Sequence, residues 1–139
     1  MRKFLIFGFV AALTGCSTLP SLNFAHNEPQ PAPAIPVFFQ PYSAALDAPA
    51  LHTIGIVAQA AAAAPNARVI ITGAADNVGS PQANKLLSET RAQIVADQLV
   101  ADGISRHRIK QRGLGTVPNL APPGQPAQSA RRVLIQLQS

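Results

Sequence analysis

An aspartate and an arginine stand where their side chains could hold a ligand that carries both charges. Asp76 follows the apolar run "VIIT" at residues 69–72. Arg91 comes four residues after Leu87 and four before Val95, so these three side chains share one face of a predicted helix. A guanidinium can donate two parallel hydrogen bonds to a carboxylate, and a carboxylate accepts from an ammonium group. The pair could therefore recognise a zwitterionic group, in which an ammonium and a carboxylate lie close together.

The alternative for the same two residues is a structural ion pair. A salt bridge between Asp76 and Arg91 would hold the loop after the strand to the helix without any ligand. Such a pair adds little net stability when it is buried, because desolvation can cancel the attraction. Taken in isolation, the two residues favour this structural interpretation over ligand binding.

The remaining polar residues show no spacing that predicts catalysis or a metal centre. His26, His52 and His107 form neither an HxxH nor an HExxH pattern. Ser88 lacks a glycine elbow and a placed base, so we interpret it as a helix-surface or hydrogen-bonding serine. We therefore expect no enzyme activity, no bound metal and no cofactor.

The charge of the chain is too small to predict a nucleic-acid partner. The formal net charge is +5 at pH 7, and two of the cations, Arg2 and Lys3, lie in a segment that we expect to be removed. Positive residues gather in "RHRIKQR" at residues 106–112. We interpret this segment as a solvated strand flank rather than a patch for an anionic polymer.

Two predicted helices and four predicted strands must position the pair. Asp47 and Pro49 predict the start of the first helix, with a buried stripe at Leu51, Ile54, Val57/Ala58 and Ala61. Ser80–Pro81 begins the second helix, which ends at Asp102–Gly103. Strands are expected at residues 37–39 and 67–73, around Ile109, and at 131–138. The order β-α-β-α-β-β predicts an α+β, two-layer fold, a mixed sheet with helices on one face.

This arrangement predicts a crevice for the two charged residues. Asp76 follows the carboxyl end of a strand, and the loop after it leads into a helix N-terminus, a position that favours anions. Arg91 lies three turns into that helix, on the face that meets the sheet. We expect Arg91 to form the floor of the crevice and Asp76 its rim.

The N-terminus has the pattern of a lipoprotein precursor. A basic start and a short apolar run lead into "LTGC" at residues 13–16, which resembles a bacterial lipobox. The resemblance implies a signal peptide over residues 1–15, cleavage before Cys16, and acylation of Cys16. An ordinary secretory signal that ends near a cysteine is the alternative. Ser17 in place of an aspartate resembles the pattern that sorts lipoproteins to the outer membrane, which implies a lipid-anchored protein with its domain in the periplasm.

A proline-rich segment separates Cys16 from the predicted domain. Residues 16–36 end in "PQPAPAIP", whose alternating prolines favour polyproline II over a packed element. We interpret residues 16–36 as a semi-rigid tether, with a disordered spacer as the alternative. The remaining residues, 37–139, have the length of one ordinary domain.

One stretch of the predicted domain carries a family resemblance. The sequence "GAADNVGSPQANKLLSETRA" at residues 73–92 resembles the signature of the OmpA C-terminal domain, which is also found in the peptidoglycan-associated lipoprotein Pal. The matching positions are Gly73, Asp76, Gly79, Ser80, Asn84, Leu87, Ser88, Arg91 and Ala92, without a gap. "GLGTVP" at 113–118 and "RRV" at 131–133 extend the resemblance over residues 37–139. Alanines at positions 74, 75, 83 and 130 replace more polar or aromatic residues of the signature.

The resemblance implies both a function and a set of site residues. The family binds the peptide stem of peptidoglycan through diaminopimelate, so this chain is expected to bind peptidoglycan without cutting it. The family's paired aspartate and arginine correspond to Asp76 and Arg91. Its signature asparagine corresponds to Asn84, and the first arginine of its terminal Asn-Arg-Arg corresponds to Arg131.

Two other classes of function are compatible with parts of the sequence. The chain could be a structural lipoprotein subunit of an envelope-spanning secretion or conjugation complex, with the OmpA-like fold used for protein docking. It could also be a peptidoglycan hydrolase, but we find no nucleophile, metal triad or carboxylate pair for that reaction. Binding to purified sacculi would separate the first class from the peptidoglycan-binding hypothesis.

Overall fold

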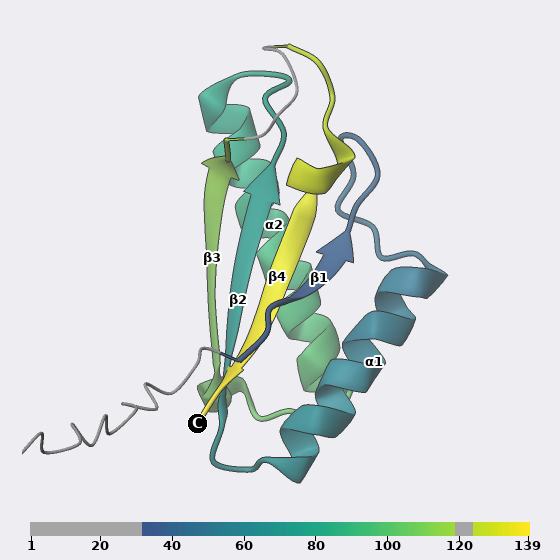
Figure 1. The fold of residues 1–139 in the computed structure, drawn as a ribbon, viewed down its shortest axis with the longest axis vertical. Coiled ribbons are helices and arrows are strands. Elements are labelled where there is room, and N and C mark those ends of the chain that lie inside the picture. Colours follow the sequence, from purple (N-terminus) through teal and green to yellow (C-terminus); the bar gives the residue numbers. More distant parts are fainter. Residues whose placement is uncertain (1–31, 119–123) are drawn as a thin grey trace, which may run out of the picture.

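The computed structural model describes residues 32–118 and 124–139. The predicted signal peptide, Cys16 and most of the predicted tether lie outside these residues. The described residues form one four-stranded sheet with two helices, and Figure 1 shows α2 behind the sheet and α1 along β1. No helix within the described ranges combines the length and the hydropathy that a membrane crossing requires.

The predicted order of elements is confirmed. The strands are β1 (Ile35–Phe38), β2 (Arg68–Ala75), β3 (Ile109–Thr116) and β4 (Arg132–Gln138), the helices are α1 (Ala48–Ala63) and α2 (Pro81–Ala101), and short 3-10 helices cover Arg106–Arg108 and Gln128–Ala130. The first strand begins at Ile35, two residues before its predicted start, so β1 takes in the end of the segment that we interpreted as tether. Ile35 pairs with Ile135 in β4, which explains the earlier start.

The sheet topology decides which loops meet. The strand order is β1-β4-β2-β3, with β4 antiparallel to both neighbours and β2 parallel to β3. β1, β2 and β3 therefore run in the same direction, and their carboxyl ends lie at the same edge as the start of β4. Asp76 directly follows β2 and Arg131 directly precedes β4, so the topology brings these two charged residues together.

Both helices begin as the sequence predicts. Asp47 accepts a hydrogen bond from the Ala50 N–H at 2.9 Å, and Ser80 accepts one from the Ala83 N–H at 3.1 Å. The buried face of α1 runs through Ala50, Ile54, Val57, Ala58 and Ala61. The prediction for Leu51 was wrong, because Ala50 takes the core-facing position in this turn and Leu51 remains 43% exposed.

Two glycines let α2 lie directly on the sheet. A β-carbon at Gly73 in β2 would lie 2.0 Å from the Ser88 backbone oxygen, and one at Gly113 in β3 would lie 2.4 Å from the Glu89 nitrogen. The Ser88 side chain is fully buried and accepts a hydrogen bond from the Gly115 N–H at 2.8 Å. Ser88 is thus a hydrogen-bonding residue and not a helix-surface one. This close approach presses the next turn of α2, which carries Arg91, against the sheet.

The basic segment 106–112 has a structural role in part. The Arg108 guanidinium donates to the carbonyls of Ala61, Ala64 and Ala67 at 2.7–2.9 Å, which closes the C-terminal end of α1. Arg106 forms a solvent-exposed ion pair with Asp97 at 3.0 Å. These contacts within the domain account for Arg106 and Arg108 without an anionic polymer.

Candidate ligand-binding site

A cavity of about 370 Å³ lies at the carboxyl ends of the parallel strands. Its lining residues are Pro41, Tyr42, Asp76, Val78, Asn84, Leu87, Arg91, Gly124, Pro126 and Arg131. All four residues that the sequence predicted for a ligand site are among them. They come from the loop after β2, from α2 and from the residue before β4, so the fold brings together groups that are up to 55 residues apart.

Asp76 forms an ion pair with Arg131 and not with Arg91, the partner expected for a structural salt bridge. The Asp76 carboxylate oxygen Oδ2 lies 3.0 Å from Arg131 Nη1, and Oδ1 accepts a weak 3.3 Å hydrogen bond from the Val78 N–H. Arg131 Nε also points to the Phe39 carbonyl at 3.4 Å. Both charged residues are only 8% exposed. The hypothesis of an Asp76–Arg91 salt bridge is wrong for this structure, because Arg131 occupies the position beside the carboxylate.

Arg91 is fully buried and makes its hydrogen bonds to the main chain. Nε donates to the Ser43 carbonyl at 2.8 Å, Nη1 to the Ala74 carbonyl at 3.3 Å and Nη2 to the Gln40 carbonyl at 3.0 Å. Its guanidinium carbon lies 5.1 Å from the centre of the Phe39 ring, within range of a cation–π contact. A permanent cation on the core-facing side of α2 is therefore accommodated by backbone oxygens from the β1–α1 loop and the end of β2.

The charges around the cavity do not balance. Two arginines, Arg91 and Arg131, face one carboxylate, Asp76, among the lining residues. Burial lowers the pKa of the Arg91 guanidinium, the Asp76 charge acts in the opposite direction, and the Arg131 cation adds to the lowering. The guanidinium of Arg91 also has more N–H donors than the three carbonyls use. A cavity with an excess of buried positive charge and free donors favours an anionic group.

Asn84 supports the position of Asp76. Its amide nitrogen donates to the Asp76 backbone carbonyl at 2.9 Å and to the Thr116 hydroxyl at 3.0 Å. The side chain is buried, and its two hydrogen bonds join the loop after β2 to the end of β3. Asn84 therefore fixes the loop that carries the carboxylate in addition to lining the cavity.

Two loops that were not predicted as parts of a site also line the cavity. Pro41 and Tyr42, from the β1–α1 loop, line one side of the cavity, and Gly124 and Pro126 line another. The first pair had a signal in the sequence, because a proline shortly after an apolar run predicts a turn beyond the strand's carboxyl end. Gly124 and Pro126 belong to the segment rich in proline and glycine between β3 and β4, of which residues 119–123 lie outside the described ranges.

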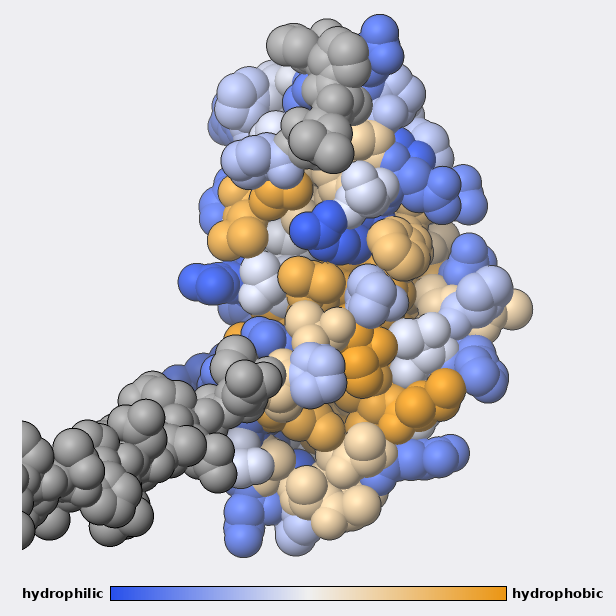
Figure 2. All heavy atoms as spheres, in the orientation of Figure 1, coloured by the Kyte–Doolittle hydropathy of each residue, from blue (hydrophilic) through white to orange (hydrophobic). Residues whose placement is uncertain are grey.

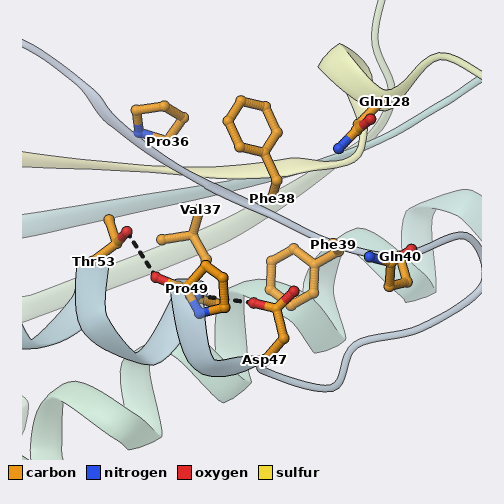
Figure 3. A pocket seen from close by; sticks show the side chains of 10 residues that line it. Pro36, Val37, Phe38, Phe39, Gln40, Asp47, Pro49, Thr53 and Gln128 are labelled. Carbon is orange, nitrogen blue, oxygen red and sulfur yellow. Dashed lines mark hydrogen bonds between the residues drawn. The ribbon is translucent and has the colours of Figure 1, made fainter.

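A second hollow, of about 270 Å³, lies between β1 and the start of α1. Figure 3 shows Val37 and Phe39 on the side of β1 that faces α1, and Phe38 on the opposite side. Its carboxylate, Asp47, caps α1, and the Thr53 hydroxyl donates to the Pro49 carbonyl at 3.0 Å. The carboxylate and the hydroxyl of this hollow are thus used within the helix, which makes the hollow the weaker candidate. No cluster in the described parts of the chain has three side chains of the types that hold a metal ion.

The fold and the charged cavity together define an OmpA-like domain. The model of the OmpA family matches residues 38–132, and the chain belongs to this family. This confirms both the resemblance and the predicted fold class. Among solved structures, the peptidoglycan-associated lipoprotein of Burkholderia pseudomallei has a TM-score of 0.67 at 24% identity, with coverage of 74% of this chain and 89% of that one. The OmpA-like domain of FopA1 from Francisella tularensis has a TM-score of 0.65 at 23% identity, with coverage of 74% and 72%.

The segments that match this chain in sequence are parts of longer proteins. The peptidoglycan-binding protein ArfA of Mycobacterium tuberculosis is 42% identical over 81 residues, which is 58% of this chain and 25% of ArfA. Outer membrane protein A of Serratia marcescens is 51% identical over 47 residues, 34% of this chain and 13% of that protein. The match with this chain thus spans at most a quarter of the length of these relatives.

Proposed function

We propose that this chain is an outer-membrane lipoprotein that binds peptidoglycan non-covalently through the diaminopimelate of the stem peptide, and so links the outer membrane to the cell wall. The observation that carries the proposal is the cavity in which two buried arginines face a single aspartate. The free end of diaminopimelate presents a carboxylate and an ammonium on one carbon. The name of the relative ArfA, a peptidoglycan-binding protein, supports peptidoglycan as the partner.

The cavity suggests a role for each charged residue. The ligand carboxylate would take the N–H donors of Arg91 that the main chain leaves unused, and the ammonium would lie against Asp76. Arg131 would hold the Asp76 carboxylate in place through the contact of 3.0 Å that the two side chains make in this structure. Since the described lining residues include no serine, cysteine or histidine, we propose binding and not cleavage.

Sacculi of two chemistries test this proposal. We expect the detergent-solubilised protein to co-sediment with sacculi that contain diaminopimelate and to bind sacculi that contain lysine at that position some tens of times more weakly. Lysine keeps the terminal ammonium but lacks the carboxylate that Arg91 would bind. Equal retention on both would contradict recognition through diaminopimelate, and retention on neither would contradict peptidoglycan binding altogether.

The lipid anchor at Cys16 lies outside the described residues and is tested separately. We expect wild-type protein to incorporate a fatty-acid analogue in growing cells, and the Cys16→Ala variant to incorporate none and to leave the membrane fraction. The acyl chains would supply the anchoring, at about 0.8 kcal/mol for each buried methylene. Ser17→Ala is the matched control and should be labelled like the wild type. An unlabelled wild-type protein would rule out acylation of Cys16.

One observation favours the second candidate, a docking subunit of an envelope-spanning complex. The face of the sheet opposite the helices, seen in Figure 2, carries apolar side chains, among them Phe38 and Leu114, which are 45% and 47% exposed. The strands contribute the cations Arg68, Lys110, Arg112 and Arg132 and no acidic residue. Such a face could meet an acidic partner. A folded wild-type protein that binds neither kind of sacculus would leave this candidate in front.

A further inference from the structure

Tyr42 has a backbone conformation that its side chain does not favour. Its φ is +53°, and it is the sole non-glycine residue with a positive φ in residues 32–118 and 124–139. In this left-handed region the β-carbon of an L-residue crowds the backbone, so bulky residues rarely adopt it. Glycine and, to a lesser degree, asparagine adopt it at lower cost.

The surrounding contacts hold the turn in this conformation. The Ser43 N–H donates to the Gln40 carbonyl at 3.3 Å, so residues 40–43 form a turn with Pro41 in its second position and Tyr42 in its third. A proline followed by a positive φ is typical of a type II turn, in which glycine is preferred at the third position. The buried guanidinium of Arg91 binds the carbonyls of Gln40 and Ser43, one on each side of Tyr42. The strained residue is therefore fixed from both ends by a cation of the candidate site.

Among the described residues, no hydrogen bond of the Tyr42 side chain compensates for this strain. Its side chain is 76% exposed, and its hydroxyl makes no hydrogen bond to the described residues. Tyr42 nevertheless lines the cavity, together with the apolar residues Pro41, Val78, Leu87 and Pro126. Strained residues of this kind persist at ligand clamps, where the conformation serves binding and not stability.

We propose that Tyr42 is a ligand-contacting residue whose ring packs against the aliphatic part of the bound diaminopimelate, next to the group held by Asp76 and Arg91. The inference rests on the proposed function and deepens it. Three methylenes separate the zwitterionic end of diaminopimelate from the carbon that joins the peptide stem. A ligand held at the charged end of the cavity would carry these methylenes past the apolar lining, where a flat ring removes them from water. Arg91 then has a second role, because it positions the turn that presents the ring.

The variant Tyr42→Asn separates a contact with the ligand from a role in the fold. Asparagine tolerates a positive φ and removes the ring, so we expect the melting temperature of the detergent-solubilised full chain to stay unchanged or to rise by a few degrees. The affinity for a soluble stem peptide that ends in diaminopimelate should fall about tenfold, because the buried aromatic contact is lost. Tyr42→Phe should bind like the wild type, since the ring is kept. Leu86→Asn, at an exposed position of α2 that does not line the cavity, is the control and should leave the affinity unchanged.

Each outcome of the titration is decisive. Weaker binding by Tyr42→Asn at an equal or higher melting temperature supports the proposal. Binding equal to the wild type overturns it and leaves peptidoglycan recognition intact. A fall in both affinity and melting temperature also overturns it, because Tyr42 would then act through the fold. A wild-type protein that does not bind the peptide overturns the proposed function and this inference together.

Discussion

Replacing Arg91 with alanine is expected to lower the free energy of unfolding by about 3–5 kcal/mol. The guanidinium fills a fully buried position and supplies hydrogen bonds to the carbonyls of Gln40, Ser43 and Ala74. Without it these oxygens lose their partner and the core gains a cavity beside Phe39. The loss is a large share of the roughly 5–15 kcal/mol that holds an ordinary domain together. Urea denaturation followed by circular dichroism measures it.

Arg112→Ala is the matched control for this prediction. Arg112 is an exposed arginine on β3, and its removal should change the free energy of unfolding by no more than about 0.5 kcal/mol. Arg91→Lys should fall between the two, because an ammonium keeps the charge but cannot reproduce a planar fork that reaches three carbonyls. If Arg91→Ala unfolds at the same urea concentration as the wild type, the contacts of the guanidinium with the main chain are not important for stability.

The elements of the fold could be predicted because their signals are local. Asp47 and Ser80 each stand directly before a helix and bind the N–H three residues on, so the cap and its partner are read from one short stretch. The position of Leu51 was less predictable, because alanine-rich α1 offers apolar residues on several faces and only the packing against the sheet selects one.

The partners of the charged residues could not be predicted, because they depend on contacts across the whole domain. Asp76 and Arg91 were found from their place on a strand end and a helix face. The carbonyls that bind Arg91 Nε and Nη2 are 48 and 51 residues away, and the arginine that binds Asp76 is 55 residues away. The sheet order β1-β4-β2-β3 brings these distant segments together in space, since it sets β4 between β1 and β2. No local sequence pattern predicts that Arg131, and not Arg91, lies beside the Asp76 carboxylate.

Asp76 is expected to have the largest effect on ligand selectivity. In the proposed complex its carboxylate accepts from the ligand ammonium while Arg131 holds it at 3.0 Å. Asp76→Ala would leave Arg91 and Arg131 as two cations in the cavity without a compensating charge. The affinity for a stem peptide with diaminopimelate should therefore fall by about 2–5 kcal/mol, or some tens to thousands of times, as measured by isothermal titration calorimetry.

The acetylated form of the same peptide distinguishes a clamp from a structural ion pair. Acetylation of the terminal amine removes its charge, so the wild type should bind the acetylated peptide much more weakly than the free amine. Asp76→Ala should bind both weakly and without preference, because the group that tells them apart is gone. A role limited to the Asp76–Arg131 contact would instead lower the melting temperature and leave the preference for the free amine in the protein that stays folded. Together with Asp76→Ala, the single variant Arg131→Ala and the double variant Asp76→Ala/Arg131→Ala complete a cycle that isolates the coupling between the two side chains. If Asp76→Ala still prefers the free amine, the ammonium is recognised elsewhere and Asp76 serves only to hold Arg131.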